Sequence, residues 1–312
     1  MDTQVRLVEV GPRDGFQSVG TFIPTDQKIA ILGHLYDSGV RRVEATSFVS
    51  AAAVPQLADA VEILAAAYAL PELDPQVLVP TVRQAERALT AGARHLAFVL
   101  SVSERHNRSN VRRTPAESAG EYRRIVDLLP AGAPLRLNVA TAFDCPYDGK
   151  IDMRQTLALL DLLVPIAPAA EIALCDTTGR VSPDHVAKLF EASTVRFPQV
   201  RSWAFHAHDT YGLGAANVLT AWNAGIRVFD ASVSGLGGCP FAPGATGNVA
   251  TEDLLWMFNG MGIASGIDLP GLLVVADEVA TLPGAQTGGR LRTAMAVRRC
   301  PTEVGKCGRH HP

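Results

Sequence analysis

The sequence is poor in the features that mark membrane, disordered and nucleic-acid-binding proteins. Its 312 residues contain no uninterrupted apolar run of about 18 residues, so no membrane-spanning helix is expected. Lysine and arginine number 28 against 31 for aspartate and glutamate, which excludes the strongly basic surface that nucleic-acid binding commonly requires. Aromatic residues are only 6% of the chain, but hydrophobic residues are 47%, which excludes intrinsic disorder.

Cysteine is also scarce, and we expect no export signal in the N-terminal residues. The five cysteines are odd in number and lack zinc-ribbon spacing, which argues against a disulfide framework or a structural zinc site. The N-terminal residues show no charged start, long apolar stretch and small-residue cleavage site. We therefore expect a cytoplasmic protein with reduced thiols. The densest basic stretch, Arg105–Arg113, is interpreted as a solvated loop, with a phosphate site as the alternative.

Short apolar runs alternate with longer amphipathic ones along most of the chain. The short runs predict eight strands: Val5–Val10, Arg42–Thr46, Gln76–Pro80, His95–Leu100, Leu135–Ala140, Ile172–Cys175, Ser202–Ala207 and Val228–Ser232. The runs with helical apolar spacing predict eight helices between and after them: Pro24–Ser38, Pro55–Ala69, Arg83–Ala91, Pro115–Leu129, Met153–Val164, Pro183–Arg196, Gly214–Ala224 and Glu252–Met261.

Eight strand–helix units indicate parallel pairing through right-handed crossovers, and they can close into a (β/α)₈ TIM barrel. A doubly wound open sheet is the alternative, but the first turn, Gly11-Pro-Arg-Asp-Gly15, is not a G-x-G-x-x-G turn. Residues 1–262 are predicted to form the catalytic barrel. Residues 263–312, with a helical pattern over Leu269–Leu282, are expected to form a C-terminal helical extension and flexible tail of the same domain.

A pair of histidines gives the sharpest functional signal. His206 and His208 flank one alanine at the end of the seventh predicted strand, so both imidazoles point to the same side. Asp14, in the turn after the first strand, and Asn248, after the last, can supply a carboxylate and an amide oxygen. In a barrel these four side chains meet at one end and predict a divalent metal site. The mixed ligand set favours Mg²⁺ or Mn²⁺ over zinc.

Three further residues are expected to act beside this metal. The segment from Gly235 to Asn248 holds five glycines among fourteen residues, which indicates a binding loop or lid, and Cys239 lies within it. Its thiol is a candidate proton donor or nucleophile, with an inert small hydrophobe as the alternative. Arg13 places a permanent cation beside Asp14, and Glu44, at the end of the second strand, can orient Arg13 or act as an acid or base.

Four ordered motifs resemble the hydroxymethylglutaryl-CoA lyase family of metal-dependent barrel lyases, which is related to Claisen-type synthases. The motifs are Val8-Glu-Val-Gly-Pro-Arg-Asp-Gly-Phe-Gln17, Glu44-Ala-Thr-Ser-Phe-Val-Ser50, His206-Ala-His-Asp-Thr-Tyr-Gly212 and Gly235-Leu-Gly-Gly-Cys-Pro240. The resemblance implies a metal held by Asp14, His206, His208 and Asn248. It implies retro-Claisen cleavage of 3-hydroxy-3-methylglutaryl-CoA to acetyl-CoA and acetoacetate, with Asp14 or His206 as base, Arg13 stabilising the enolate and Cys239 protonating it.

The chain departs from the family pattern near the expected barrel mouth. Ser18-Val-Gly-Thr21 replaces the usual Asn-Glu-Lys, Ala51-Ala52 replaces Pro-Lys, and His106 stands where an apolar or aromatic residue is common. Another 3-hydroxyacyl-CoA, such as citramalyl-CoA, is therefore an alternative substrate. A Claisen condensing acyltransferase is less favoured because its first turn differs and it carries a further domain. We expect an acyl-CoA as the partner, no nucleic acid or membrane, and a homo-oligomer.

Overall fold

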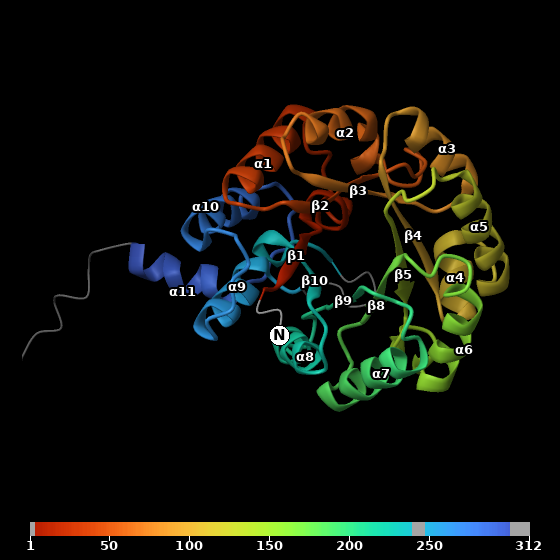
Figure 1. Cartoon of the computed structure of the whole chain (residues 1–312). Helices are drawn as coiled ribbons and strands as arrows, with labels where there is room; N and C mark the ends of the chain where they lie inside the picture. The colour runs from red at the N-terminus through yellow and green to blue at the C-terminus, as the bar shows by residue number, and fades with distance from the viewer. Residues whose placement is uncertain (1–3, 239–246, 300–312) are drawn as a thin grey trace, which may run out of the picture.

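The computed structural model describes residues 4–238 and 247–299. Eight parallel strands close into a barrel in the order β1-β10-β9-β8-β5-β4-β3-β2, with helices around it (Figure 1). The strands are β1 (Arg6–Glu9), β2 (Arg42–Ser47), β3 (Asp74–Val79), β4 (His95–Ser101), β5 (Leu135–Ala140), β8 (Glu171–Cys175), β9 (Trp203–His206) and β10 (Val228–Ala231). The predicted TIM barrel is confirmed. A separate antiparallel pair, β6 (Asp144–Cys145) and β7 (Gly149–Lys150), follows β5.

One helix after each barrel strand covers the outside of the barrel. These helices are α1 (Thr25–Asp37), α2 (Ala60–Tyr68), α3 (Val82–Thr90), α5 (Pro115–Leu128), α6 (Met153–Leu163), α7 (Pro183–Arg196), α8 (Gly214–Asn223) and α9 (Thr251–Gly260). Each turns an apolar stripe to the strands, as Ile31, Leu32 and Leu35 do in α1. The start of α2 is later than predicted, because Pro55–Leu57 forms a separate 3₁₀ turn.

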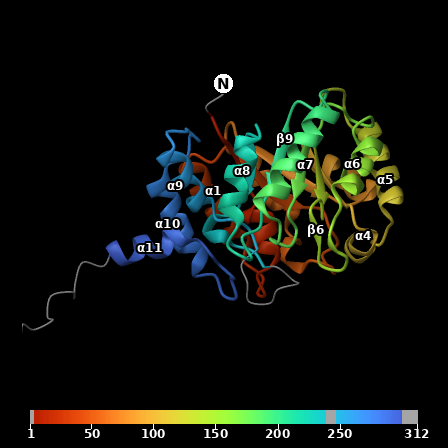
Figure 2. The same cartoon turned by 90° about the horizontal axis from the view of Figure 1, so that it is seen from below.

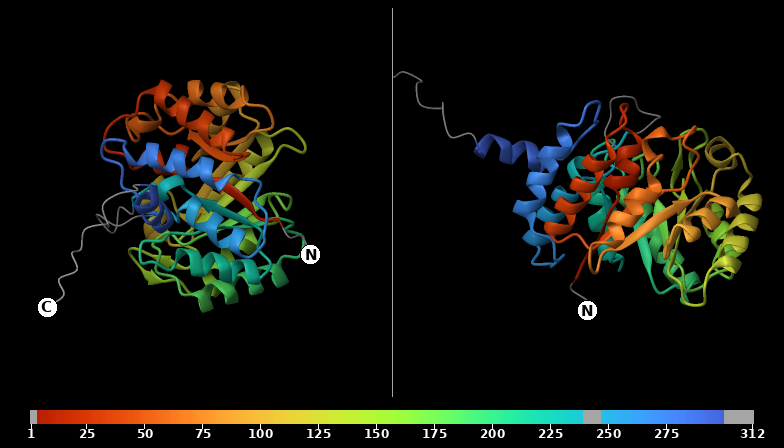
Figure 3. Two further views of the ribbon diagram at one scale, coloured as in Figure 1. Left: turned by 90° about the vertical axis from the view of Figure 1, so that its left-hand side faces the viewer. Right: turned by 90° about the horizontal axis from the view of Figure 1, so that it is seen from above.

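The chain after the barrel packs against the place where the barrel closes. Helix α10 (Leu269–Ala280) contacts α1 and α9, which are the first and last helices of the ring (Figures 1 and 2). Helix α11 (Arg290–Arg299) contacts α9 and α10 and leads away from the barrel (Figure 3). The helical extension is thus confirmed. The additional helix α11 was not predicted.

The basic stretch interpreted as a solvated loop is mostly helical instead. Helix α4 (Glu104–Val111) is capped at its N-terminus by Ser103, whose hydroxyl accepts a hydrogen bond from the backbone N–H of His106. Asn107 is buried and ties the helix to β4, because its Oδ1 accepts from the backbone N–H of Ser101 at 2.8 Å. Polar contacts rather than an apolar stripe hold this helix, so apolar periodicity could not reveal it.

The inside of the barrel is partly polar. A small apolar group, Val8, Val10, Ala173, Ala204 and Val228, fills part of the interior. Charged and amide side chains occupy the rest, among them the buried Arg136 on β5 and Asp230 on β10. Within the described ranges 4–238 and 247–299, no helix is long and apolar enough to cross a membrane.

Candidate metal centre and active site

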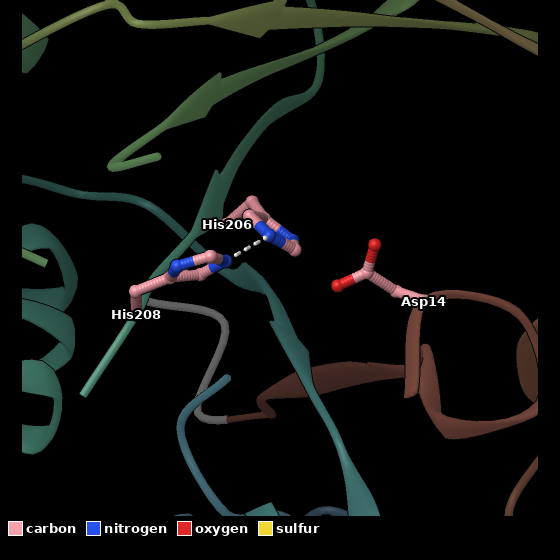
Figure 4. A group of neighbouring side chains, drawn as sticks. All are labelled: Asp14, His206 and His208. Atoms are coloured by element: carbon pink, nitrogen blue, oxygen red, sulfur yellow. Dashed lines mark hydrogen bonds between the residues drawn. The ribbon is translucent and has the colours of Figure 1, made fainter. Parts of the chain in front are cut away.

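The two predicted histidines meet at the C-terminal end of β9. His206 is the last residue of the strand and His208 follows it, and their Nε2 atoms lie 3.2 Å apart (Figure 4). His206 Nδ1 lies 3.0 Å from a carboxylate oxygen of Asp230 on β10. A proton on Nδ1 leaves Nε2 with a free electron pair, so the contact with Asp230 prepares His206 to bind a cation.

Asp14 completes a group of three potential ligands. It lies in a single π-helical turn, Gly11–Gly15, directly after β1, and faces the two imidazoles (Figure 4). One ligand atom each from Asp14, His206 and His208 lies within 4.8 Å of the others. Asn248 adds the fourth predicted ligand, because its Nδ2 donates to Asp14 Oδ2 at 2.8 Å. All four residues that the sequence nominates for the metal therefore lie together.

The amide of Asn248 indicates that these residues fit a cation. Its Oδ1 atom is buried, and no residue in the described part of the chain donates a hydrogen bond to it. Turning the amide over would direct this oxygen toward the Asp14 carboxylate, an arrangement that a positive charge between the two oxygens stabilises. Gly237 leaves room for the amide, since a Cβ atom there would lie 2.6 Å from Asn248 Nδ2.

Arg13 lies between two carboxylates at the edge of the site. Its Nε donates to Glu44 Oε2 at 2.6 Å, its Nη2 contacts the same oxygen, and its Nη1 donates to Asp14 Oδ1 at 2.5 Å. Glu44 lies on β2, which pairs with β1 through Glu9 and Val43 and so brings the two side chains together. This geometry supports the predicted role of Glu44 in orienting Arg13.

The surroundings of Asp14 and His208 favour the forms of these residues that can bind a cation. Burial raises the pKa of Asp14, but the Arg13 guanidinium and the two histidines more than reverse this, so the net pKa lies below its ordinary value. Burial, together with the charge of His206, lowers the pKa of His208 to about 3. Burial also lowers the pKa of His206, yet the hydrogen bond and charge of Asp230 raise it overall. The pKa directions of Asp14 and His208 thus favour a charged carboxylate and a neutral imidazole, the forms that bind a cation.

A buried ion network supports Asp230 from inside the barrel. Arg136 on β5 is 1% exposed, and its Nη2 donates to both carboxylate oxygens of Asp230 at 2.7 Å. Its Nη1 donates to Glu171 at 3.0 Å and its Nε to Asn138 at 2.8 Å. Because these partners fix Arg136, they also fix the carboxylate that contacts His206.

Sequence reasoning missed both Arg136 and Asp230. Each is a charged residue inside a strand predicted as almost wholly apolar, Leu135–Ala140 and Val228–Ser232. A charge in such a strand must find a partner within the barrel, and this was the available signal. Cys239, the predicted proton donor, lies outside the described residues, so the structure says nothing of its position.

Comparison with known proteins agrees with this geometry. The HMGL-like family model matches residues 4–279. The chain is 38% identical to the cytoplasmic 3-hydroxy-3-methylglutaryl-CoA lyase of Rattus norvegicus over 93% of this chain and 84% of that protein. It is 37% identical to the (R)-citramalyl-CoA lyase of Chloroflexus aurantiacus over 99% of this chain and 96% of that protein.

A solved structure extends the likeness to the whole fold. The HMG-CoA lyase of A. baumannii, in complex with coenzyme A and 3-methylmalate, matches with a TM-score of 0.87 and 37% identity, covering 100% of this chain and 98% of that one. The predicted resemblance is thereby confirmed. The chain belongs to the hydroxymethylglutaryl-CoA lyase family and is an enzyme of the oxo-acid lyase type.

Proposed function

We propose that the protein is a metal-dependent carbon–carbon lyase that cleaves a 3-hydroxyacyl-CoA to acetyl-CoA and an oxo acid. The observation that carries this proposal is the convergence of Asp14, His206, His208 and Asn248 beside the Arg13–Glu44 pair. The first candidate substrate is 3-hydroxy-3-methylglutaryl-CoA, which would give acetoacetate. Citramalyl-CoA is the second, because a relative matched over nearly its full length is a citramalyl-CoA lyase.

The four converging residues would hold Mg²⁺ or Mn²⁺. Such an ion supplies a Lewis acid that lowers the pKa of the substrate hydroxyl and orients the neighbouring oxygen. One carboxylate, two imidazoles and one amide would be the donors that the protein offers to such an ion. This ligand set supports the proposal, and the choice between the two metals belongs to experiment.

The remaining groups of the site can carry the proton and charge transfers. Asp14 or His206 accepts the hydroxyl proton. As the new carbonyl forms, the electrons of the broken carbon–carbon bond pass to the thioester enolate. Arg13, held by Glu44, stabilises the enolate oxygen. Cys239 gives its proton to the enolate carbon, which yields acetyl-CoA.

A panel of thioesters tests this function. Protein stripped of metal and supplied with Mn²⁺ is incubated with 3-hydroxy-3-methylglutaryl-CoA, citramalyl-CoA and a longer 3-hydroxyacyl-CoA, and acetyl-CoA is measured. Release from at least one substrate supports the proposal, and the best substrate identifies the acyl group. Cleavage of none contradicts it. Release of free CoA from acetyl-CoA and a 2-oxo acid would instead favour the condensing acyltransferase.

Two further predictions accompany this proposal. We propose a cytoplasmic location, although the names of the relatives include both cytoplasmic and mitochondrial lyases. We also propose a homo-oligomer of two or more chains. Fractionation of source cells and light scattering of the purified protein test these two points separately.

A further inference from the structure

Gln76 is a buried amide inside the barrel that lies apart from the metal ligands. It lies on β3, is 0% exposed, and neither its Oε1 nor its Nε2 has a hydrogen-bond partner among residues 4–238 and 247–299. In the pairing of β2 with β3, Gln76 stands directly opposite Glu44. Opposed residues of parallel strands point to the same face, and Glu44 faces the barrel interior toward Arg13, so Gln76 does so as well.

Glu44 has a matching unsatisfied atom. Its Oε2 accepts the hydrogen bond from Arg13, whereas its Oε1 is buried without a donor in the part of the chain that the structure describes. Three polar atoms on two opposed side chains are thus left without protein partners. Burying such an atom without a hydrogen bond lowers the free energy of unfolding by about 1–3 kcal/mol, unless water satisfies it. Buried water characteristically bridges groups of this kind, since it needs at least two polar partners.

We propose that ordered water inside the barrel joins the Gln76 amide to Glu44 Oε1, which makes Gln76 a positioning residue for the reaction. Water accepts a hydrogen bond from Gln76 Nε2 and donates one to Glu44 Oε1. Glu44 is then held at both oxygens, by Arg13 on one side and by the water on the other. The guanidinium that faces the substrate is fixed in turn. This inference rests on the proposed lyase function, because the role of Arg13 does.

The hydrogen bond to Glu44 Oε1 matters because it favours the charged form of this carboxyl group. Burial raises the pKa of this carboxyl group, which opposes the charged form that pairs with Arg13. A hydrogen bond donated to the charged form favours it. Without this bond, the carboxylate is free to turn its second oxygen toward Arg13 or to take up a proton, and either change shifts the guanidinium.

A double-mutant cycle separates this role from simple packing. Gln76→Met keeps the length of the side chain but removes the amide, and we expect kcat to fall roughly tenfold, the effect of one hydrogen bond to a charged group. KM and Mn²⁺ affinity stay within about twofold. In a Glu44→Gln background the same change has no further effect on kcat, because the carboxylate that it acts on is gone. Leu78→Met, on the same strand, is the matched control and leaves kcat unchanged.

A crystal structure of the wild type with Mn²⁺ provides a readout that does not depend on activity. Water within hydrogen-bond distance of both Gln76 and Glu44, absent from Gln76→Met, supports the inference. Direct contact of the two side chains, or no ordered water between them, overturns it, as does an equal loss of kcat in both backgrounds. If the wild type cleaves no thioester, the proposed function fails, while the crystal structure still decides whether the bridge exists.

Discussion

Replacing Asp230 by asparagine tests how the barrel interior prepares the metal centre. Asp230 accepts hydrogen bonds from Arg136 with both oxygens and lies 3.0 Å from His206 Nδ1. Asparagine has the same size but only one acceptor oxygen, so its NH₂ group must face either the guanidinium or the imidazole N–H. In the second case His206 loses the partner that keeps its Nε2 free of a proton.

The expected cost is a 10- to 100-fold weaker Mn²⁺ affinity, the range typical for residues that orient a histidine ligand. This corresponds to about 1.4–2.7 kcal/mol of binding free energy. Titration calorimetry on metal-free protein measures it. Glu171→Gln is the matched control, because it also takes one carboxylate from Arg136 but does not touch His206. Mn²⁺ binding by Asp230→Asn within twofold of the wild type would show that Asp230 does not prepare His206 for the ion.

Three other predictions follow from individual contacts. Cys239→Ala should lower turnover about 10²- to 10⁴-fold with Mn²⁺ affinity retained, as loss of a general acid does, and unchanged turnover would exclude the thiol as proton donor. Burial raises the pKa of Glu252 to about 8, so the folded state retains a proton that the unfolded state releases above about pH 4.5. The free energy of unfolding of the wild type therefore falls as pH rises from about 4.5 to 8. Glutamine cannot titrate, so urea unfolding should show Glu252→Gln gaining stability relative to the wild type across that range. A constant difference would contradict the shift. Lys28→Met breaks a buried ion pair with Asp59 and should lower the free energy of unfolding by about 3–5 kcal/mol, whereas a loss under 1 kcal/mol would show that Asp59 finds other partners.

The regular part of the fold could be predicted because each unit repeats one pattern. Mostly apolar strands and amphipathic helices identify every βα unit, and their number indicates the closed barrel. Helix α11 could not be predicted from such a local pattern. The backbone N–H groups of Arg290 and Leu291 donate to the carboxylate of Asp253 on α9, so the residue that caps this helix lies far upstream in the sequence. No pattern local to the helix records that contact.

In the candidate metal site, too, the sequence predicts some residues and misses others. His206 and His208 stand two residues apart at the end of one predicted strand, so their convergence could be expected from strand geometry. The partners that prepare them come from elsewhere in the barrel: Asp230 from β10 and Arg136 from β5, 94 residues apart in sequence. Gln76 likewise gains significance only from its place opposite Glu44. Sequence spacing identifies ligands at the end of one strand. The charged residues that support those ligands come from strands far apart in the sequence, which become neighbours only when the barrel closes.

If this barrel cleaves a 3-hydroxyacyl-CoA with a divalent ion held by Asp14 and the histidine pair, cleavage must depend on both the ion and these residues. The most direct test measures acetyl-CoA release from 3-hydroxy-3-methylglutaryl-CoA and citramalyl-CoA by EDTA-treated protein, before and after Mn²⁺ is added, for the wild type and His208→Ala. We expect no release without metal, restoration by Mn²⁺ in the wild type, and little restoration in the variant. Full activity after metal removal, or equal restoration in His208→Ala, would contradict it.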